Sequence, residues 1–150
     1  MKIVIVSGYF NPLHGGHLDM IEAAARLGDK LIVVVNNDRQ AVMKKGKIIL
    51  DEANRLRLIR ALRDVDEAML SIDTKDTSQT ETLQAIRVRY PDDELVFANG
   101  GDRREGQSLP QNEYAVCVAN DIEMIFGVGS SDVEKRDSST RINQALGHES

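Results

Sequence analysis

The sequence predicts an α/β fold in which a parallel sheet of five strands is covered by helices on both faces. Five short apolar runs alternate along the chain with segments whose apolar residues recur at helical spacing. The runs are continuously apolar, which is typical of strands that are buried on both faces. Strands and helices in alternation indicate parallel βαβ units with right-handed crossovers. We therefore expect a doubly wound sheet, with its ligand site outside the carboxyl ends of the strands.

The strands are expected where the apolar runs lie. In chain order these are KIVIV at 2–6, KLIVVV at 30–35, EAMLSI at 67–72, ELVFA at 94–98 and IEMIFGV at 122–128. The second run suits a central strand because it contains three consecutive valines, and the Asn-Asn-Asp that follows is typical of a strand end that opens into a loop.

Helices are expected between the strands. Helical spacing is shown by three sets of apolar residues, which are Leu18, Ile21 and Ala25, then Leu56, Ile59 and Leu62, then Leu83 and Ile86. The polar stretch 99–111 is the longest connection and is expected to be a mobile loop, and residues 146–150 are expected to be frayed.

Composition narrows the class of protein. The 150 residues predict one domain, 1–150, with a substantial core. The chain carries 19 Lys and Arg against 24 Asp and Glu, so we expect neither a nucleic-acid partner nor an anionic membrane surface. Cys117 is the only cysteine, which excludes an internal disulfide and fits a reducing cytoplasm. No apolar run approaches the roughly 18 residues of a membrane span, so a cytoplasmic protein without a signal peptide or anchor is expected.

The stretch GYFNPLHGGHLDMI, residues 8–21, leaves the first expected strand at the edge where ligands bind. Gly8 and Gly16 allow close backbone approach, and the free N–H groups of a helix that starts near Gly16 attract anions. His14 and His17 can donate hydrogen bonds to a negative oxygen. This combination predicts a phosphate site.

Two other interpretations of the histidine pair stay open. Histidines near a helix start are often turn and cap residues, which need no ligand. A metal site is a weaker alternative, because no third ligand is evident and the H-x-x-H spacing lacks the i, i+4 geometry of a helical zinc pair.

The string G-x-F-x-P-x-H-x-G-H, residues 8–17, resembles the signature of the cytidylyltransferase-like nucleotidyltransferase family. Stretches 25–38 and 55–67 are similar to parts of the glycerol-3-phosphate cytidylyltransferases and heptose-phosphate adenylyltransferases of that family. NGGDR at 99–103 and SSTRI at 138–142 resemble its fourth-strand and C-terminal nucleotide-binding motifs. The resemblance covers residues 2–142 and implies a Rossmann-like sheet of the HxGH type.

The resemblance also implies an activity. Such enzymes transfer a nucleoside monophosphate from a nucleoside triphosphate (NTP) to a phosphorylated small molecule, such as a sugar or polyol phosphate, and release pyrophosphate. It implies Mg²⁺ as cofactor, CTP slightly ahead of ATP as donor, and a homodimer. A non-catalytic nucleotide-binding sensor of flavodoxin-like shape is the alternative. A fragment of a class I aminoacyl-tRNA synthetase is disfavoured by the short chain and the lack of a Lys-Ser-Lys loop.

Roles for individual residues follow from the matched motifs. The expected catalytic residues are His14, His17, Lys44 and Arg141; the nucleotide-binding residues are Gly8, Tyr9, Phe10, Gly16, Gly101, Asp102, Arg103, Ser138, Ser139 and Thr140; and the substrate-binding residues are Lys44, Arg55 and Arg63. The two arginines resemble family positions that face the active site or the dimer contact, whereas Arg57 and Arg60 are expected to face solvent. Taken alone, the lysine run is typical of a solvated loop, Gly-Gly-Asp of a turn and SSTRI of a helix N-cap.

Overall fold

The computed structural model describes residues 1–100 and 111–129, which form a parallel five-stranded sheet with helices on both faces. The strands are β1 (Lys2–Gly8), β2 (Lys30–Val35), β3 (Glu67–Leu70), β4 (Glu94–Gly100) and β5 (Ile122–Val128), and their order in the sheet is β3-β2-β1-β4-β5. The helices are α1 (Gly15–Ala25), α2 (Asp38–Lys45), α3 (Glu52–Arg60), α4 (Thr80–Arg89) and α5 (Gln111–Ala119). Every strand pair is parallel, so the predicted fold class is confirmed.

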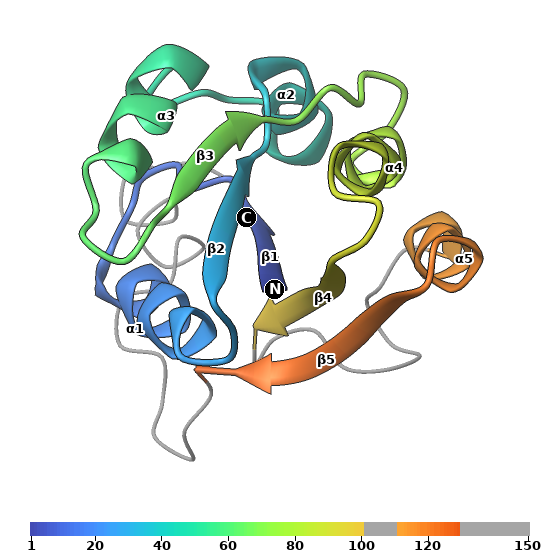
Figure 1. Cartoon of the computed structure of the whole chain (residues 1–150). Helices are drawn as coiled ribbons and strands as arrows, with labels where there is room; N and C mark the ends of the chain where they lie inside the picture. The colour runs from blue at the N-terminus through green and yellow to red at the C-terminus, as the bar shows by residue number, and fades with distance from the viewer. Residues whose placement is uncertain (101–110, 130–150) are drawn as a thin grey trace.

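Alternate residues of the central strand β1 supply two separate cores. Val4 and Val6 belong to the core that α1 and α3 cover, whereas Ile3 and Ile5 belong to the core that α4 and α5 cover. Figure 1 shows α1 and α3 on one side of the sheet and α4 and α5 on the other. Because both faces of the strand are buried, both sets of positions must be apolar, which explains the continuous apolar runs.

The strand order reverses direction beside β1. The chain from β1 to β3 builds the sheet outward on one side, and β4 then returns to pair with β1 on its other side. A crevice outside the carboxyl ends of the strands is expected at such a reversal. The loop that follows β1 and carries the two histidines starts at this point.

Two helices were not expected from the apolar spacing. Helix α2 has one buried apolar residue, Ala41, and Cys117 is the one buried apolar residue among residues 112–119 of α5, so neither helix shows a clear apolar stripe. Leu62, expected within the second helix, lies beyond the end of α3 but still packs against the core. The expectations for the 99–111 loop and for 146–150 lie wholly or largely outside the described residues. Among the helices that the structure describes, none has the length and apolar character that crossing a membrane requires.

Candidate active site

The loop after β1 makes a tight turn around the ring of Phe10. Phe10 has a positive φ of 51° and its side chain is buried. A Cβ atom at Gly8 would lie 2.7 Å from Cζ of that ring, so only glycine fits beneath it. The space above Gly8, expected to admit a ligand, is therefore filled by the protein's own phenyl ring.

His14 is the N-cap residue of α1, and the two histidines cap each other's backbone. Nδ1 of His14 accepts a hydrogen bond from the backbone N–H of Gly16 at 3.1 Å, and Nδ1 of His17 accepts one from the backbone N–H of His14 at 3.2 Å. A backbone N–H can only donate, so neither Nδ1 carries a proton in this arrangement. Each neutral imidazole therefore carries its proton on Nε2 and can donate from that atom.

The two imidazoles form one packed unit. Their ring centroids lie 3.8 Å apart with an angle of 27° between the planes, and the Phe10 ring meets His17 edge-on at 4.9 Å. The buried phenyl ring thereby supports both half-buried imidazoles. Capping and phosphate binding were alternative interpretations of the histidine pair. In the structure the two are compatible, because they use different nitrogens of each ring.

Backbone groups expected to line a nucleotide have protein partners. The Gly8 carbonyl accepts from the N–H of Asn36 at 2.8 Å, the Tyr9 carbonyl accepts from Arg55 at 2.8 Å, and the Gly16 N–H is bound to His14. These three groups hold the loop in place. These contacts occupy the Gly8 and Tyr9 carbonyls and the Gly16 N–H, and the direct contact of these residues with a nucleotide stays a prediction.

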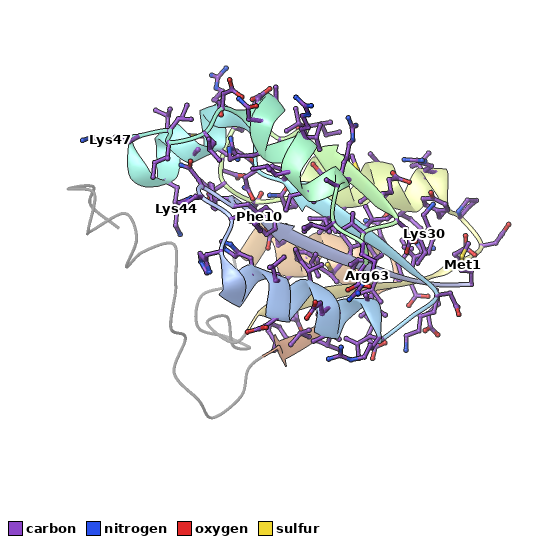
Figure 2. All side chains as sticks on the ribbon, turned by 90° about the vertical axis from the view of Figure 1, so that its left-hand side faces the viewer. Met1, Phe10, Lys30, Lys44, Lys47 and Arg63 are labelled. Atoms are coloured by element: carbon purple, nitrogen blue, oxygen red, sulfur yellow. The ribbon has the colours of Figure 1, made fainter. Side chains whose placement is uncertain are left out.

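Lys44 lies in the last turn of helix α2, which Gly46 ends in the left-handed conformation at φ 74°. The expected solvated loop is thus a helix end. Lys44 is exposed, and within the described ranges it has neither an ion pair nor a hydrogen bond. Figure 2 shows Lys44 extending from α2 on the side where α1 begins, whereas Lys47 projects away from it. The expected contact of the Lys44 ammonium with a phosphate stays a prediction.

The two arginines expected to bind substrate have different surroundings. Arg55 is fully buried and donates four hydrogen bonds to protein acceptors, so its guanidinium has no surface to offer a substrate. Arg63 has an 86% exposed side chain near Glu22 and Asp64. It follows the end of α3, a helix that starts at the carboxyl edge of the sheet and runs away from it (Figure 2). The structure therefore does not bring Arg63 to the histidines, and its part in a dimer contact stays a prediction.

Other residues of the predicted site cannot be located. Gly101, Asp102 and Arg103 fall in the undescribed range 101–110, and the SSTRI residues Ser138, Ser139, Thr140 and Arg141 fall in 130–150. Their expected roles stay predictions. Arg57 and Arg60 are exposed, as expected.

Asn11 is a residue of the loop that sequence reasoning passed over. It is buried, its Oδ1 accepts from the N–H groups of Ile49 and Leu50, and its Nδ2 donates to the carbonyl of Lys47. Asn11 thus fastens the segment after α2 to the histidine loop. The available signal was an amide side chain in an otherwise apolar stretch, a residue type that hydrogen-bonds backbone groups in turns.

The described residues do not build a site for a metal ion of their own. Across residues 1–100 and 111–129 there is no group of three or more His, Cys, Asp or Glu side chains that could hold one. Hard cations such as Mg²⁺ need several oxygen ligands, which the histidine loop does not supply. These residues therefore do not fit a resident Mg²⁺.

The sequence as a whole decides the family. A family model described as cytidylyltransferase-like matches residues 5–145. The chain belongs to the cytidylyltransferase-like family. The resemblance to this family that the histidine motif carries is thus confirmed.

Curated relatives of this cytidylyltransferase-like chain include bifunctional proteins. The bifunctional protein HldE of Desulfatibacillum aliphaticivorans is 34% identical over 147 residues, which are 97% of this chain and 27% of that protein. An FAD synthase of Methanolacinia petrolearia is 36% identical over 92 residues, which are 61% of this chain and 57% of that enzyme. The chain spans between 20% and 27% of the length of the first four HldE relatives.

A solved structure of similar size has the same fold. The crystal structure of the lipopolysaccharide core biosynthesis protein from Thermoplasma volcanium GSS1 superposes with a TM-score of 0.65 at 27% sequence identity. The match covers 89% of this chain and 99% of that protein.

Proposed function

We propose that this cytidylyltransferase-like chain transfers a nucleoside monophosphate from an NTP to a phosphorylated small molecule and releases pyrophosphate. The observation that carries the proposal is the pair of stacked imidazoles, His14 and His17, each with an Nε2–H donor at the start of α1. The pair stands beside the strand-order reversal, where ligands of parallel sheets bind.

The proposed reaction is one in-line displacement at the α-phosphorus. An oxygen of the acceptor phosphate forms the new P–O bond, the bond to the bridging oxygen of the β-phosphate breaks, and its electron pair leaves with pyrophosphate. The attacking oxygen is already an anion, so the reaction requires no strong base. Charge that builds up on the phosphoryl oxygens must be stabilised, and neutral Nε2–H donors and the Lys44 ammonium suit that task.

Mg²⁺ belongs to the substrate in this scheme. The described residues do not fit a resident metal ion, so the cation would enter bound to the triphosphate oxygens. It would neutralise phosphate charge there. The chain's own residues orient the phosphates and donate hydrogen bonds to them.

The parts of the site outside the described residues are proposed from the motifs alone. Asp102 would accept a ribose hydroxyl, with Gly101 and Arg103 beside the nucleotide. The hydroxyls of Ser138–Thr140 and the guanidinium of Arg141 would hold the phosphates that leave as pyrophosphate.

ATP is the donor that we propose, in place of the CTP preferred from the sequence. Two of the relatives are FAD synthases, whose product contains adenine. A sugar phosphate or polyol phosphate is the proposed acceptor, with FMN as a further candidate because FAD is FMN joined to AMP.

A coupled assay tests the proposal. The protein is incubated with each NTP, Mg²⁺ and inorganic pyrophosphatase against a panel of sugar phosphates, polyol phosphates and FMN, and released phosphate is measured. We expect release with ATP and one acceptor class, and much less with CTP. Tight NTP binding without release from any acceptor would instead identify a nucleotide-binding sensor.

A further inference from the structure

Arg55 joins segments that are far apart in the chain. Its side chain is fully buried in the first turn of α3. Nε donates to the carbonyl of Leu50 at 2.8 Å, and Nη1 donates to the carbonyls of Tyr9 at 2.8 Å and Asn36 at 2.6 Å. Nη2 forms an ion pair with Asp38 at 2.6 Å. Four of the five guanidinium N–H donors are therefore used within the protein.

The acceptors of Arg55 belong to the two halves of the proposed site. Tyr9 lies in the histidine loop, directly after Gly8, the last residue of β1, while Asn36 and Asp38 lie at the start of α2. Leu50 lies in the segment that leaves α2 and that Asn11 also binds. One planar group thus fixes the histidine loop, the start of α2 and the segment after α2 relative to one another.

Lys44 depends on this arrangement for its position. It is exposed and has no partner of its own within the described ranges. Helix α2 has few buried apolar contacts, since Ala41 is its one buried apolar residue. Its start is instead held by polar contacts: Arg55 binds Asp38, and the carboxylate of Glu52 accepts from the N–H of Asp38 at 2.8 Å. The side-chain amides of Asn37 and Gln40 also fasten it, since they donate to the carbonyls of Ser71, Asp73, Asp76 and Ser78. The position of the Lys44 ammonium therefore depends on these polar contacts.

We propose that Arg55 is a positioning residue that holds α2, and with it Lys44, at the distance from the histidine loop that the reaction needs. This inference rests on the proposed function. It replaces the substrate contact expected for Arg55 with an action through Lys44. Lysine cannot replace it, because one ammonium lacks the planar set of donors that meets three carbonyls and a carboxylate together.

A double-mutant cycle tests the proposal. The variants Arg55→Lys, Lys44→Met and the double variant are assayed for kcat and KM with ATP and the acceptor found active. We expect each single variant to lower kcat/KM by at least about tenfold, and Arg55→Lys to cost less than about threefold once Lys44 is gone. Additive losses would mean that Arg55 acts on the fold in general and would overturn the proposal. Lys47→Met is the matched control, since Lys47 projects away from the site, and its small effect should add to that of Arg55→Lys (Figure 2).

A milder variant covers the case in which Arg55→Lys does not fold. Asp38 is 30% exposed in its side chain, and Asp38→Asn keeps the hydrogen-bond acceptor while removing the charge. Its smaller loss should also vanish in the Lys44→Met background.

Failure of the proposed function gives a different result. If the parent protein binds ATP but transfers no nucleotide, the proposed function is wrong, and the same cycle is measured on the dissociation constant of ATP. Non-additive affinities would then support the positioning role. If the parent neither transfers a nucleotide nor binds ATP, both the function and the positioning role are overturned.

Discussion

Replacing His14 separates the two tasks of its imidazole. Nδ1 accepts the N–H of Gly16 at 3.1 Å and caps α1, whereas Nε2–H is the proposed phosphate donor. In His14→Asn the amide oxygen can accept the same N–H, but no donor reaches the position of Nε2. In His14→Ala both are lost. The two variants share the loss of stacking on His17, so their difference isolates the cap.

The expected magnitudes differ for the two tasks. Losing an N-cap acceptor costs about 1 kcal/mol, so His14→Ala should be less stable than His14→Asn by that amount. For a chain of this size, that difference corresponds to roughly 2 to 4 °C in melting temperature. Losing a donor to the reacting phosphate costs about 10² to 10³ in kcat, and this loss should be the same in both variants.

Two measurements check these values. Calorimetry gives the melting temperatures without ligand, and phosphate release at saturating ATP and acceptor gives kcat. If His14→Asn keeps kcat within about threefold of the parent, Nε2 does not stabilise the transition state. If the two variants melt at the same temperature, the hydrogen bond to Gly16 contributes nothing to stability.

Three other predictions concern separate parts of the chain. Lys44→Met should raise the activation free energy by about 2 to 4 kcal/mol, as for a charge-assisted contact, and Lys47→Met should change kcat/KM far less; equal losses would mean that only local charge density matters. Arg141→Gln should weaken NTP binding and remove most of the rise in melting temperature that NTP causes, and an unchanged rise would show that Arg141 does not hold phosphate. Burial, with the charge of Glu113 second, raises the pKa of the Cys117 thiol from 9.0 to about 12. The unfolded chain therefore loses this proton first as pH rises, so urea unfolding should show stability falling between pH 9 and 12, and Cys117→Ala should lack this component of the fall.

The layered sheet and its ligand edge could be predicted from the sequence. A strand that is buried on both faces needs apolar residues at every position, and KLIVVV at 30–35 shows this requirement directly. The loop motif of residues 8–17 identified the family because its residue types are local and closely spaced. Helix α2 was not predicted, because polar contacts to other segments hold it in place. It therefore lacks the apolar spacing by which a helix is predicted.

Tertiary structure alone decided the surroundings of Arg55 and Arg63. Both arginines lie in the same stretch of sequence, eight residues apart, and both matched the family pattern. A helical rise of about 1.5 Å per residue over the nine residues of α3 carries the chain away from the site, so Arg63 emerges at a distant surface. Arg55 is buried because three backbone carbonyls and Asp38 surround its guanidinium, one of them 46 residues away at Tyr9. Backbone carbonyls are the same in every residue type, so no side-chain pattern could have shown where they would meet.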